Sequence, residues 1–490
     1  MSIWRVKPVS AFEADMKKSE LKRVLGKWSL TAIGIGAIIG GGIFVLTGTG
    51  AYYHAGPALA LSFIIAGVAC VFAALCYSEF ASILPVEGSA YAYAYGTIGE
   101  LFAWIIGWGL ILEYAMGSMT VAVSWSGYFN KLLKMFGLHL PDWLTSDPAS
   151  YTGEGFSMNL PAFCIVLFVI YILMKGTQGA AKANNLIVML KVSAVLFVII
   201  AGAFFINTAN WHPFIPDAKS IVDAAGKSHE AYGIKGVISG AAAIFFAYVG
   251  FDAVSTQAGE AINPKKDVPF AIITSLLVCT FLYILVSLVL TGMMNYSDFN
   301  PLGKYPEAIK APVAYAFDIA GQAWAGYVVT IAATIGLISV LMVMIMGQSR
   351  IFLGMSKDGL IPPVFSKIHG TSGTPKTNLL ILGVIIAIVA AFTPINKLAD
   401  MTSFGTLFAF TMVCIAVWIL RKKQPELTRP FKVPFLPVIA TCGILINTYL
   451  MINLSIDAQM LSLGWLVIGI FIYFIYGKRK AKLNNPDKEV

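Results

Sequence analysis

Charged residues are scarce in this chain of 490 amino acids. Asp, Glu, Lys and Arg account for 12% of it, against roughly 25% in soluble domains, and apolar residues account for 58%. A chain with so little charge cannot cover a water-exposed surface, which excludes an ordinary soluble globular protein. The formal net charge of +9 would suggest nucleic acid only if the basic residues formed one patch. They are distributed along the whole length, so we expect no nucleic-acid partner.

Cysteine and histidine are sparse as well. All six cysteines lie in apolar stretches and none forms a CxxC pair, which indicates small core residues rather than disulfides or metal ligands. The five histidines fall in expected loops or helix ends and offer no pair on one helix face. We therefore expect no metal, no cofactor and no catalytic residues, and the chain is not predicted to be an enzyme.

Long stretches without charge are what the chain has in abundance. About 20 apolar residues are needed for a helix to cross a bilayer. Twelve stretches come near that length, and five of them carry one or two charged residues, among them Glu113, Lys191 and Asp252. They are 29–52, 58–83, 99–129, 160–174, 184–206, 234–259, 268–293, 313–347, 378–393, 401–420, 434–453 and 459–477. The sequence therefore predicts an all-α polytopic membrane protein with 12 transmembrane helices.

Lys and Arg are shared unevenly between the segments that join these stretches. With the N-terminus placed in the cytoplasm, 25 of the 34 fall in inner segments, eight in outer ones and one, Lys191, inside a span. An excess of basic residues marks the cytoplasmic loops of membrane proteins. We expect a multi-pass protein of the plasma (inner) membrane, with the N-terminal segment 1–27 and the tail 478–490 in the cytoplasm.

Glycine is concentrated in the first span. The segment GIGAIIGGGIF, residues 34–44, has five glycines within nine residues, although each costs a helix roughly 1 kcal/mol relative to alanine. Gly36 and Gly40 have GxxxG spacing, which lets helices pack closely. Three consecutive glycines exceed what packing requires, and the sixth span is interrupted too, at FFAYVGFDAV, residues 245–254. Gly-interrupted segments at corresponding positions of two halves point to a substrate site in inverted-repeat transporters.

Longer stretches make a family resemblance specific. The segments GIGAIIGGGIFVLTG, AGPALALSFIIAGVACVFAALCYSEF and FFAYVGFDAVSTQAGEAINPKKDVPF are followed by GQSRIFLGMSKDGLIPPVF (347–365) and SFGTLFAFTMVCIAVWILR (403–421). In this order they resemble the amino acid–polyamine–organocation (APC) transporter superfamily, and within it the cationic amino acid transporter (CAT) branch. The resemblance runs from about residue 25 to 435.

This resemblance implies a LeuT-like fold with a 5+5 inverted repeat and breaks in helices 1 and 6. Helices 1–5 would come from residues 28–206 and helices 6–10 from residues 234–421. Residues 207–233 would form an extracellular linker between the repeats, and residues 422–477 would form the peripheral helices 11 and 12.

Broken helices suit a free amino acid, because its carboxylate and ammonium are costly to desolvate without partners. A half-helix N-terminus offers free N–H groups to the carboxylate, and a half-helix C-terminus offers carbonyl oxygens to the ammonium. The resemblance also implies that Phe246 closes over the bound substrate. The expected substrate-binding residues at the two breaks are Ile38, Gly40, Gly41, Gly42 and Ile43 in the first span and Phe246, Ala247 and Val249 in the sixth.

One lysine, Lys191, interrupts the fifth span. Its stem either reaches the membrane interface, where the ammonium stays hydrated, or remains buried, where desolvation disfavours the charged form. In similar transporters a fifth-helix lysine reaches the unwound part of helix 1. We expect proton-coupled uptake through Lys191, with Glu113 and Asp252 as further candidates. Either acid could instead hold the fold by pairing with lysine or with backbone amides.

Two methionines bear on substrate choice. The resemblance places Met342 of helix 8 and Met116 of helix 3 at the side-chain pocket. Bulky thioethers would shorten that pocket and leave a cationic side chain unpaired, although methionine is also an ordinary filler of membrane cores. We expect proton symport of small neutral L-amino acids such as alanine. The alternatives are a cationic amino acid transporter or exchanger, in which Glu113 pairs with arginine or lysine, and an amino acid-sensing transceptor. The expected partners are the amino acid, protons and the lipid bilayer, and the sequence identifies no protein partner.

Overall fold

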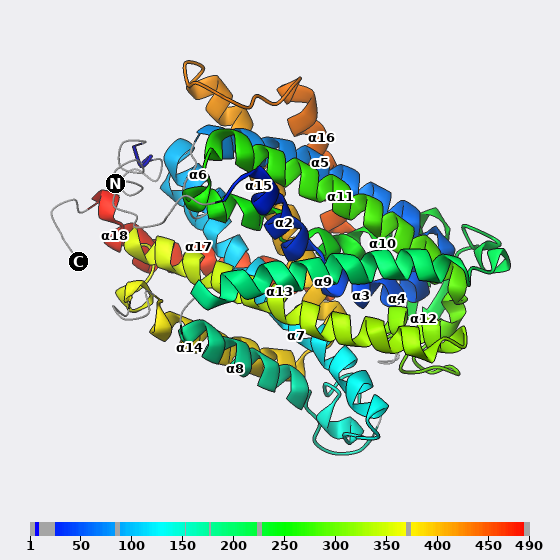
Figure 1. Ribbon diagram of the computed structural model, residues 1–490. Coiled ribbons are helices and arrows are strands. Elements are labelled where there is room, and N and C mark those ends of the chain that lie inside the picture. The colour runs from blue at the N-terminus through cyan, green and yellow to red at the C-terminus, as the bar shows by residue number, and fades with distance from the viewer. Residues whose placement is uncertain are drawn as a thin grey trace.

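The chain folds into a bundle of long helices (Figure 1). The structure is a computed structural model that describes residues 5–8, 25–83, 89–151, 153–175, 178–222, 228–368 and 374–484. Of the N-terminal segment 1–27, all but residues 5–8 and 25–27 lie outside this description. The strands within it are β1 (Lys219–Val222) and β2 (Ser228–Ala231), which pair antiparallel with Lys219 opposite Ala231.

In the first half of the chain, the first span is interrupted and longer helices follow it. In order they are α2 (Lys27–Ile38), α3 (Gly41–Phe44), α4 (Leu46–Gly50), the π-helix η1 (Ala51–Ala55), η2 (Gly56–Ala58), α5 (Leu59–Ile83), α6 (Ser89–Thr97), α7 (Glu100–Met135), η3 (Asp142–Leu144), α8 (Leu160–Met174), α9 (Gln178–Ala203) and η4 (Thr208–Trp211).

The second half repeats this pattern of one interrupted helix followed by longer ones. In order they are α10 (Gly233–Ala243), the 3-10 segments η5 (Ile244–Tyr248) and η6 (Phe251–Glu260), α11 (Pro264–Met293), η7 (Tyr296–Phe299), α12 (Pro312–Ile319), α13 (Ala323–Lys357), η8 (Pro363–Ser366), α14 (Lys376–Phe392), α15 (Ile395–Lys423), α16 (Leu436–Ile452), α17 (Ile456–Ile472), η9 (Tyr473–Gly477), α18 (Lys478–Lys480) and η10 (Lys482–Asn484).

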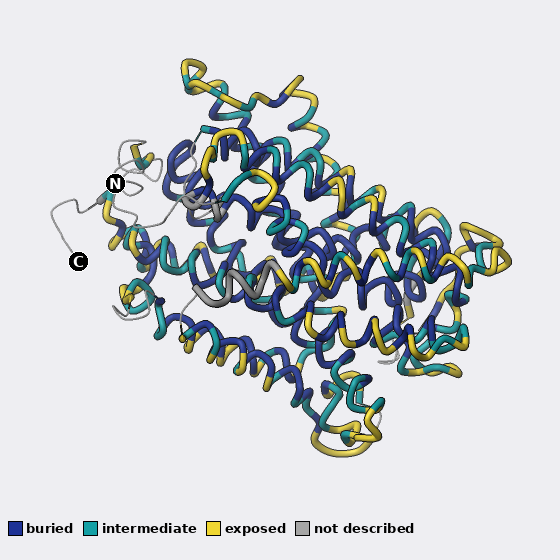
Figure 2. Tube along the Cα trace, viewed as in Figure 1, coloured by how far each residue is buried: buried dark blue, intermediate teal, exposed yellow. Residues whose placement is uncertain are grey.

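Eight helices in the described ranges are long and apolar enough to cross a membrane, counting consecutive segments such as Leu46–Ile83 as one. Three further apolar helices are shorter: α8, α14 and α16 have 15, 17 and 17 residues. The outward faces of the bundle's helices carry large apolar side chains, which a bilayer accommodates and water does not. Examples are Met189 on α9 and Met460 on α17, both more than two-thirds exposed. Figure 2 shows the buried residues gathered along the centre of the bundle.

Two predicted segments differ in the structure from what the sequence indicated. The stretch 313–347 is not one span: α12 ends at Ile319 and α13 begins at Ala323, because Gly321 adopts a φ of +75° that ends a helix. The segment 207–233, for which the sequence indicated no regular structure, contains the β1–β2 hairpin. The hairpin lies at the end of the bundle opposite α18 (Figure 1).

The described residues nearest the two termini lie close together at the α18 end of the bundle. The Arg5 guanidinium donates to the carbonyl oxygen of Leu483 at 2.7 Å. Lys7 bridges to Asp358, just past the end of α13, at 3.0 Å. An N-terminal and a C-terminal segment on the same side require an even number of membrane crossings.

Candidate substrate site

The first span breaks at the glycine cluster. Helix α2 ends at Ile38, Ile39 takes an extended conformation (ψ 101°), and α3 begins at Gly41 after an extended Gly40. The last carbonyls of α2 and the first amides of α3 therefore have no partners within their own helices. This interruption lies where the sequence predicted it.

The sixth span breaks at Val249 and Gly250. Val249 is extended (ψ 133°), and Gly250 has a φ of +114°, a conformation that side chains rarely adopt. A Cβ atom on Gly250 would lie 3.0 Å from the carbonyl oxygen of Ala37 in α2. The backbones of the two broken spans are therefore in direct contact.

The glycines of the first span allow close contact with three other helices. A Cβ atom on Gly42 would lie 2.3 Å from the Cα atom of Ala247, and one on Gly36 would lie 2.2 Å from Cγ2 of Val188 in α9. One on Gly40 would lie 3.3 Å from Val340 of α13. Both readings of the glycine pattern therefore apply, since Gly36 permits packing and Gly40 to Gly42 accompany the break.

Lys191 is completely buried and does not reach the membrane interface. Its ammonium donates to the carbonyl oxygen of Gly36 and, at 3.2 Å, to that of Ile39. Gly336 of α13 leaves room for the stem, because a Cβ atom there would lie 2.6 Å from Cγ of Lys191. The lysine therefore binds carbonyls that the end of α2 leaves without helical partners.

Tyr283 of α11 occupies the space between the two breaks, and sequence reasoning did not find it. Its hydroxyl lies within hydrogen-bond distance of the carbonyl oxygens of Ile38 (2.8 Å) and Ala247 (2.9 Å). Its single proton can serve one of them at a time. Its only sequence signal was a phenolic hydroxyl in a stretch without charge, CTFLYILVSLV.

The eight substrate-binding residues expected at the two breaks lie together at this junction, and all eight are buried. The carbonyl of Phe246 accepts from the amide of Val249 at 3.1 Å, and those of Ile38 and Ala247 face Tyr283. A carbonyl oxygen has two lone pairs, so each can accept a second hydrogen bond. The arrangement thus offers carbonyl oxygens from both breaks, and the amides of Gly41, Gly42 and Ile43 from the start of α3.

Glu113 and Asp252 are both buried, with different surroundings. Tyr114 donates to Oδ2 of Asp252 at 3.0 Å, which joins α7 to the segment after the second break. Both carboxylate oxygens of Glu113 are buried and have no hydrogen-bond partner among the described residues. Its backbone packs against Gly405 of α15, where a Cβ atom would lie 3.2 Å from the amide nitrogen of Glu113. Among the described residues, no lysine donates a hydrogen bond to Glu113.

The methionines named for the side-chain pocket, Met342 and Met116, lie on α13 and α7. Val340 is the α13 residue that contacts Gly40, and Met342 lies about 200° further around that helix. Met344 faces α7, with its sulfur 3.6 Å from the position of a Cβ atom on Gly117. Met116 is half-buried, about 100° around α7 from Gly117. Met344, one turn after Val340, therefore lies on nearly the same face of α13 as Val340, and Met342 lies on another face.

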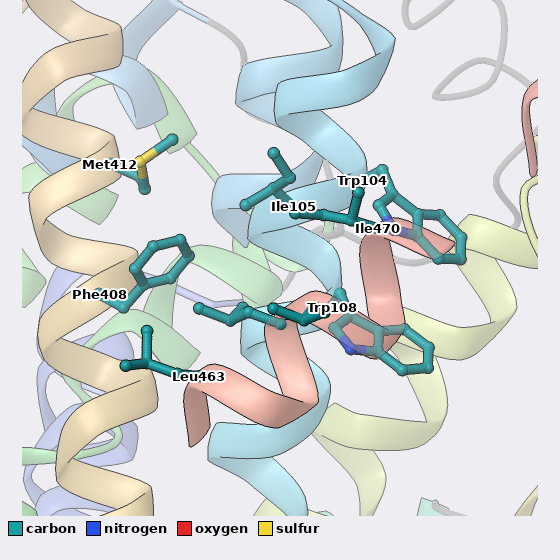
Figure 3. A pocket seen from close by; sticks show the side chains of 9 residues that line it. Trp104, Ile105, Trp108, Phe408, Met412, Leu463 and Ile470 are labelled. Atoms are coloured by element: carbon teal, nitrogen blue, oxygen red, sulfur yellow. The ribbon is translucent and has the colours of Figure 1, made fainter. Parts of the chain in front are cut away.

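An apolar cavity of about 390 Å³ lies elsewhere, between α7, α15 and α17. Figure 3 shows Trp104 and Trp108 on one side and Phe408 and Met412 on the other. Its lining has no ionisable side chain to neutralise a zwitterion. We therefore place the candidate site at the junction of the two breaks and not in this cavity.

Two interrupted helices that meet inside a bundle of apolar helices define a multi-pass membrane protein with polar backbone exposed in its interior, an arrangement found in transporters. A family model described as "Amino acid permease" matches residues 25–476. The chain belongs to this amino acid permease family, within the APC superfamily, and the family resemblance is confirmed.

Named relatives agree with this assignment. The chain is 44% identical over 484 residues to "Branched-chain amino acid permease BcaP" of Bacillus subtilis (strain 168), covering 99% of both proteins. It is 42% identical over 483 residues to "Methylthioribose transporter" of the same organism, again covering 99% of both. It is 36% identical over 409 residues to "Cationic amino acid transporter 4, vacuolar" of Arabidopsis thaliana, covering 83% of this chain and 64% of that protein. These relatives are transporters and not enzymes.

Proposed function

We propose that this permease is a proton-coupled symporter of neutral L-amino acids that works by alternating access. The observation that carries this proposal is Lys191, a fully buried ammonium that binds the carbonyls of Gly36 and Ile39 at the break of the first span. A titratable group at that place can order or release the break according to its protonation. Glu113 and Asp252 are further candidates for the proton path.

The test of this function is counterflow. Proteoliposomes loaded with unlabelled L-alanine should accumulate external labelled L-alanine, because a transporter exchanges substrate across the membrane. L-leucine is tested in parallel, since one relative is named a branched-chain amino acid permease. A transceptor would bind either amino acid without counterflow, and that result would remove the proposal.

The proposed architecture is LeuT-like, with 12 transmembrane helices. Residues 28–206 and 234–421 form the two inverted repeats, residues 207–233 are the extracellular linker and residues 422–477 are peripheral. Two features support it. The first segments of both halves are interrupted, and the two breaks meet at Gly42 and Ala247. The excess of basic residues on one side supports cytoplasmic termini.

Cysteine labelling tests this topology. After the exposed native Cys164 is replaced by serine, Ser220→Cys in β1 and Ser146→Cys in the 136–159 loop should react with an impermeant maleimide in intact cells. Ser366→Cys in η8, between α13 and α14, is the matched control and should react only after permeabilisation. The reverse pattern at all three sites would invert the topology.

We propose small neutral side chains, alanine-like, as the preferred substrates. The apolar groups near the junction, including Phe246, Val340 and Met344, favour an uncharged side chain. The name of the branched-chain relative supports neutral specificity in general and extends it to larger side chains.

Competition distinguishes neutral from cationic specificity. We expect a hundredfold excess of L-arginine to leave labelled L-alanine uptake almost unchanged, because an unpaired guanidinium is among the costliest groups to bury. Unlabelled L-alanine at the same concentration is the positive control. Strong inhibition by arginine would establish the second candidate, a cationic transporter or exchanger. That candidate is favoured by Glu113, whose buried carboxylate has no partner among the described residues.

A further inference from the structure

Ser124 of α7 has a buried hydroxyl that its own helix does not use. The residue is 1% exposed, and its Oγ atom has no hydrogen-bond partner among the described residues. Serine and threonine in a helix ordinarily donate to the carbonyl one turn back. Ser118 and Thr120 on the same helix do this, to Tyr114 at 2.7 Å and Met116 at 2.8 Å. Ser124 differs from both neighbours.

This hydroxyl points at the break of the first span. A Cβ atom on Gly41 would lie 2.6 Å from Oγ of Ser124 and 3.7 Å from Cε1 of Phe246. One turn further along the same face of α7, Tyr128 donates to the carbonyl oxygen of Phe44 at 2.7 Å. The face of α7 that carries Ser124 therefore lies along α3. Ser124 lies beside Gly41, the first residue of α3, and Tyr128 lies beside Phe44, the last.

The space beside Gly41 can hold one group only. Oγ of Ser124 takes the place that any side chain at position 41 would need. The hydroxyl of Ser124 thus reaches the junction from α7 beside Gly41, which has no side chain. Burial of a hydroxyl without a hydrogen-bond partner is unfavourable, and a ligand that accepts a hydrogen bond from it removes this cost.

We propose that Ser124 is a substrate-positioning residue whose hydroxyl donates a hydrogen bond to the carboxylate of the bound amino acid. The inference rests on the proposed amino acid transport and adds a side-chain donor to the backbone amides of α3. The carboxylate is the chemical partner that fits, because it only accepts hydrogen bonds and the neighbouring carbonyls of Ile38 and Ala247 cannot donate to it.

The test is binding of L-alanine and L-leucine to purified Ser124→Ala, measured by thermal shift and isothermal titration. Loss of a hydrogen bond to a charged group should weaken binding by about 10- to 100-fold. Without ligand, the melting temperature should stay the same or rise, because the change removes an unpaired buried hydroxyl. A residue with a purely structural role would lower it. Ser118→Ala, which removes a buried hydroxyl bonded within α7, is the matched control and should keep the affinity of the unmodified protein.

Relocating the hydroxyl gives a second, independent readout. Gly41→Ser alone should lose binding, since its Cβ atom meets Oγ of Ser124. Combined with Ser124→Gly, it places a hydroxyl in the same space from the opposite side and should bind more tightly than Ser124→Gly alone. Unchanged affinity in Ser124→Ala, or no recovery in the double variant, would overturn the proposal. If the unmodified protein binds neither amino acid, the proposed function fails and this inference with it, and that outcome is visible without any variant.

Discussion

Lys191→Ala should abolish uptake driven by a pH gradient. In sodium-free proteoliposomes that are acidic outside, labelled L-alanine uptake should fall by at least about 100-fold, because the variant loses two charge-assisted hydrogen bonds, each worth about 1.5–3 kcal/mol. The carbonyl oxygens of Gly36 and Ile39 would lose the ammonium of Lys191 as hydrogen-bond donor. The break in the first span would then lose its ordered conformation. The measurement is initial uptake rate with and without the gradient.

Two further measurements separate coupling from folding. Counterflow at equal pH on both sides requires no net proton movement, so it should retain more activity in Lys191→Ala than gradient-driven uptake does. Lys235→Ala is the matched control, since Lys235 is an exposed lysine 3.5 Å from Glu230, and it should transport like the unmodified protein. Full pH-driven uptake in Lys191→Ala, or a requirement for sodium in the unmodified protein, would contradict proton coupling through this residue.

Gly42→Ala should eliminate both substrate binding and transport. The added Cβ atom would lie 2.3 Å from the Cα atom of Ala247 and 3.0 Å from its nitrogen, so the backbone of the second break must move. Overpacking of this kind costs about 1–3 kcal/mol, and it displaces the carbonyls expected to bind the ammonium. We expect a melting temperature lowered by several degrees and no stabilisation by L-alanine in a thermal-shift titration.

The control for this variant is a glycine with open space around it. A Cβ atom on Gly464, on the exposed face of α17, would meet no atom within 4 Å. Gly464→Ala should therefore bind and transport normally, with stability unchanged or raised by up to about 1 kcal/mol. Ala247→Gly should not rescue Gly42→Ala, because it removes the contact with Cβ of Ala247 at 2.4 Å but leaves the contact with its Cα at 2.3 Å. Normal transport in Gly42→Ala would show that the breaks need not meet this closely.

The membrane class and the positions of both breaks could be predicted from the sequence, because each depends on local composition. Hydrophobicity over a window of about 20 residues identifies a span whatever its neighbours are. The glycines of residues 34–42 and the lone Lys191 are conspicuous for the same reason. The continuous stretch 313–347 misled this reading, since Gly321 ends a helix through its backbone conformation while the hydropathy stays high.

The partners at the site were decided only by the tertiary structure. Tyr283, Ser124 and the contact between Gly42 and Ala247 each depend on which face a helix turns inward. A soluble helix reveals that face by its apolar stripe, but a membrane span is apolar all round and carries almost no such signal. One residue is a rotation of about 100°, so the sequence could place methionines on α13 without deciding which helix each of them faces. The sequence by itself determined that this is a membrane protein and where its first and sixth spans break; packing of the helices decided which side chains meet there.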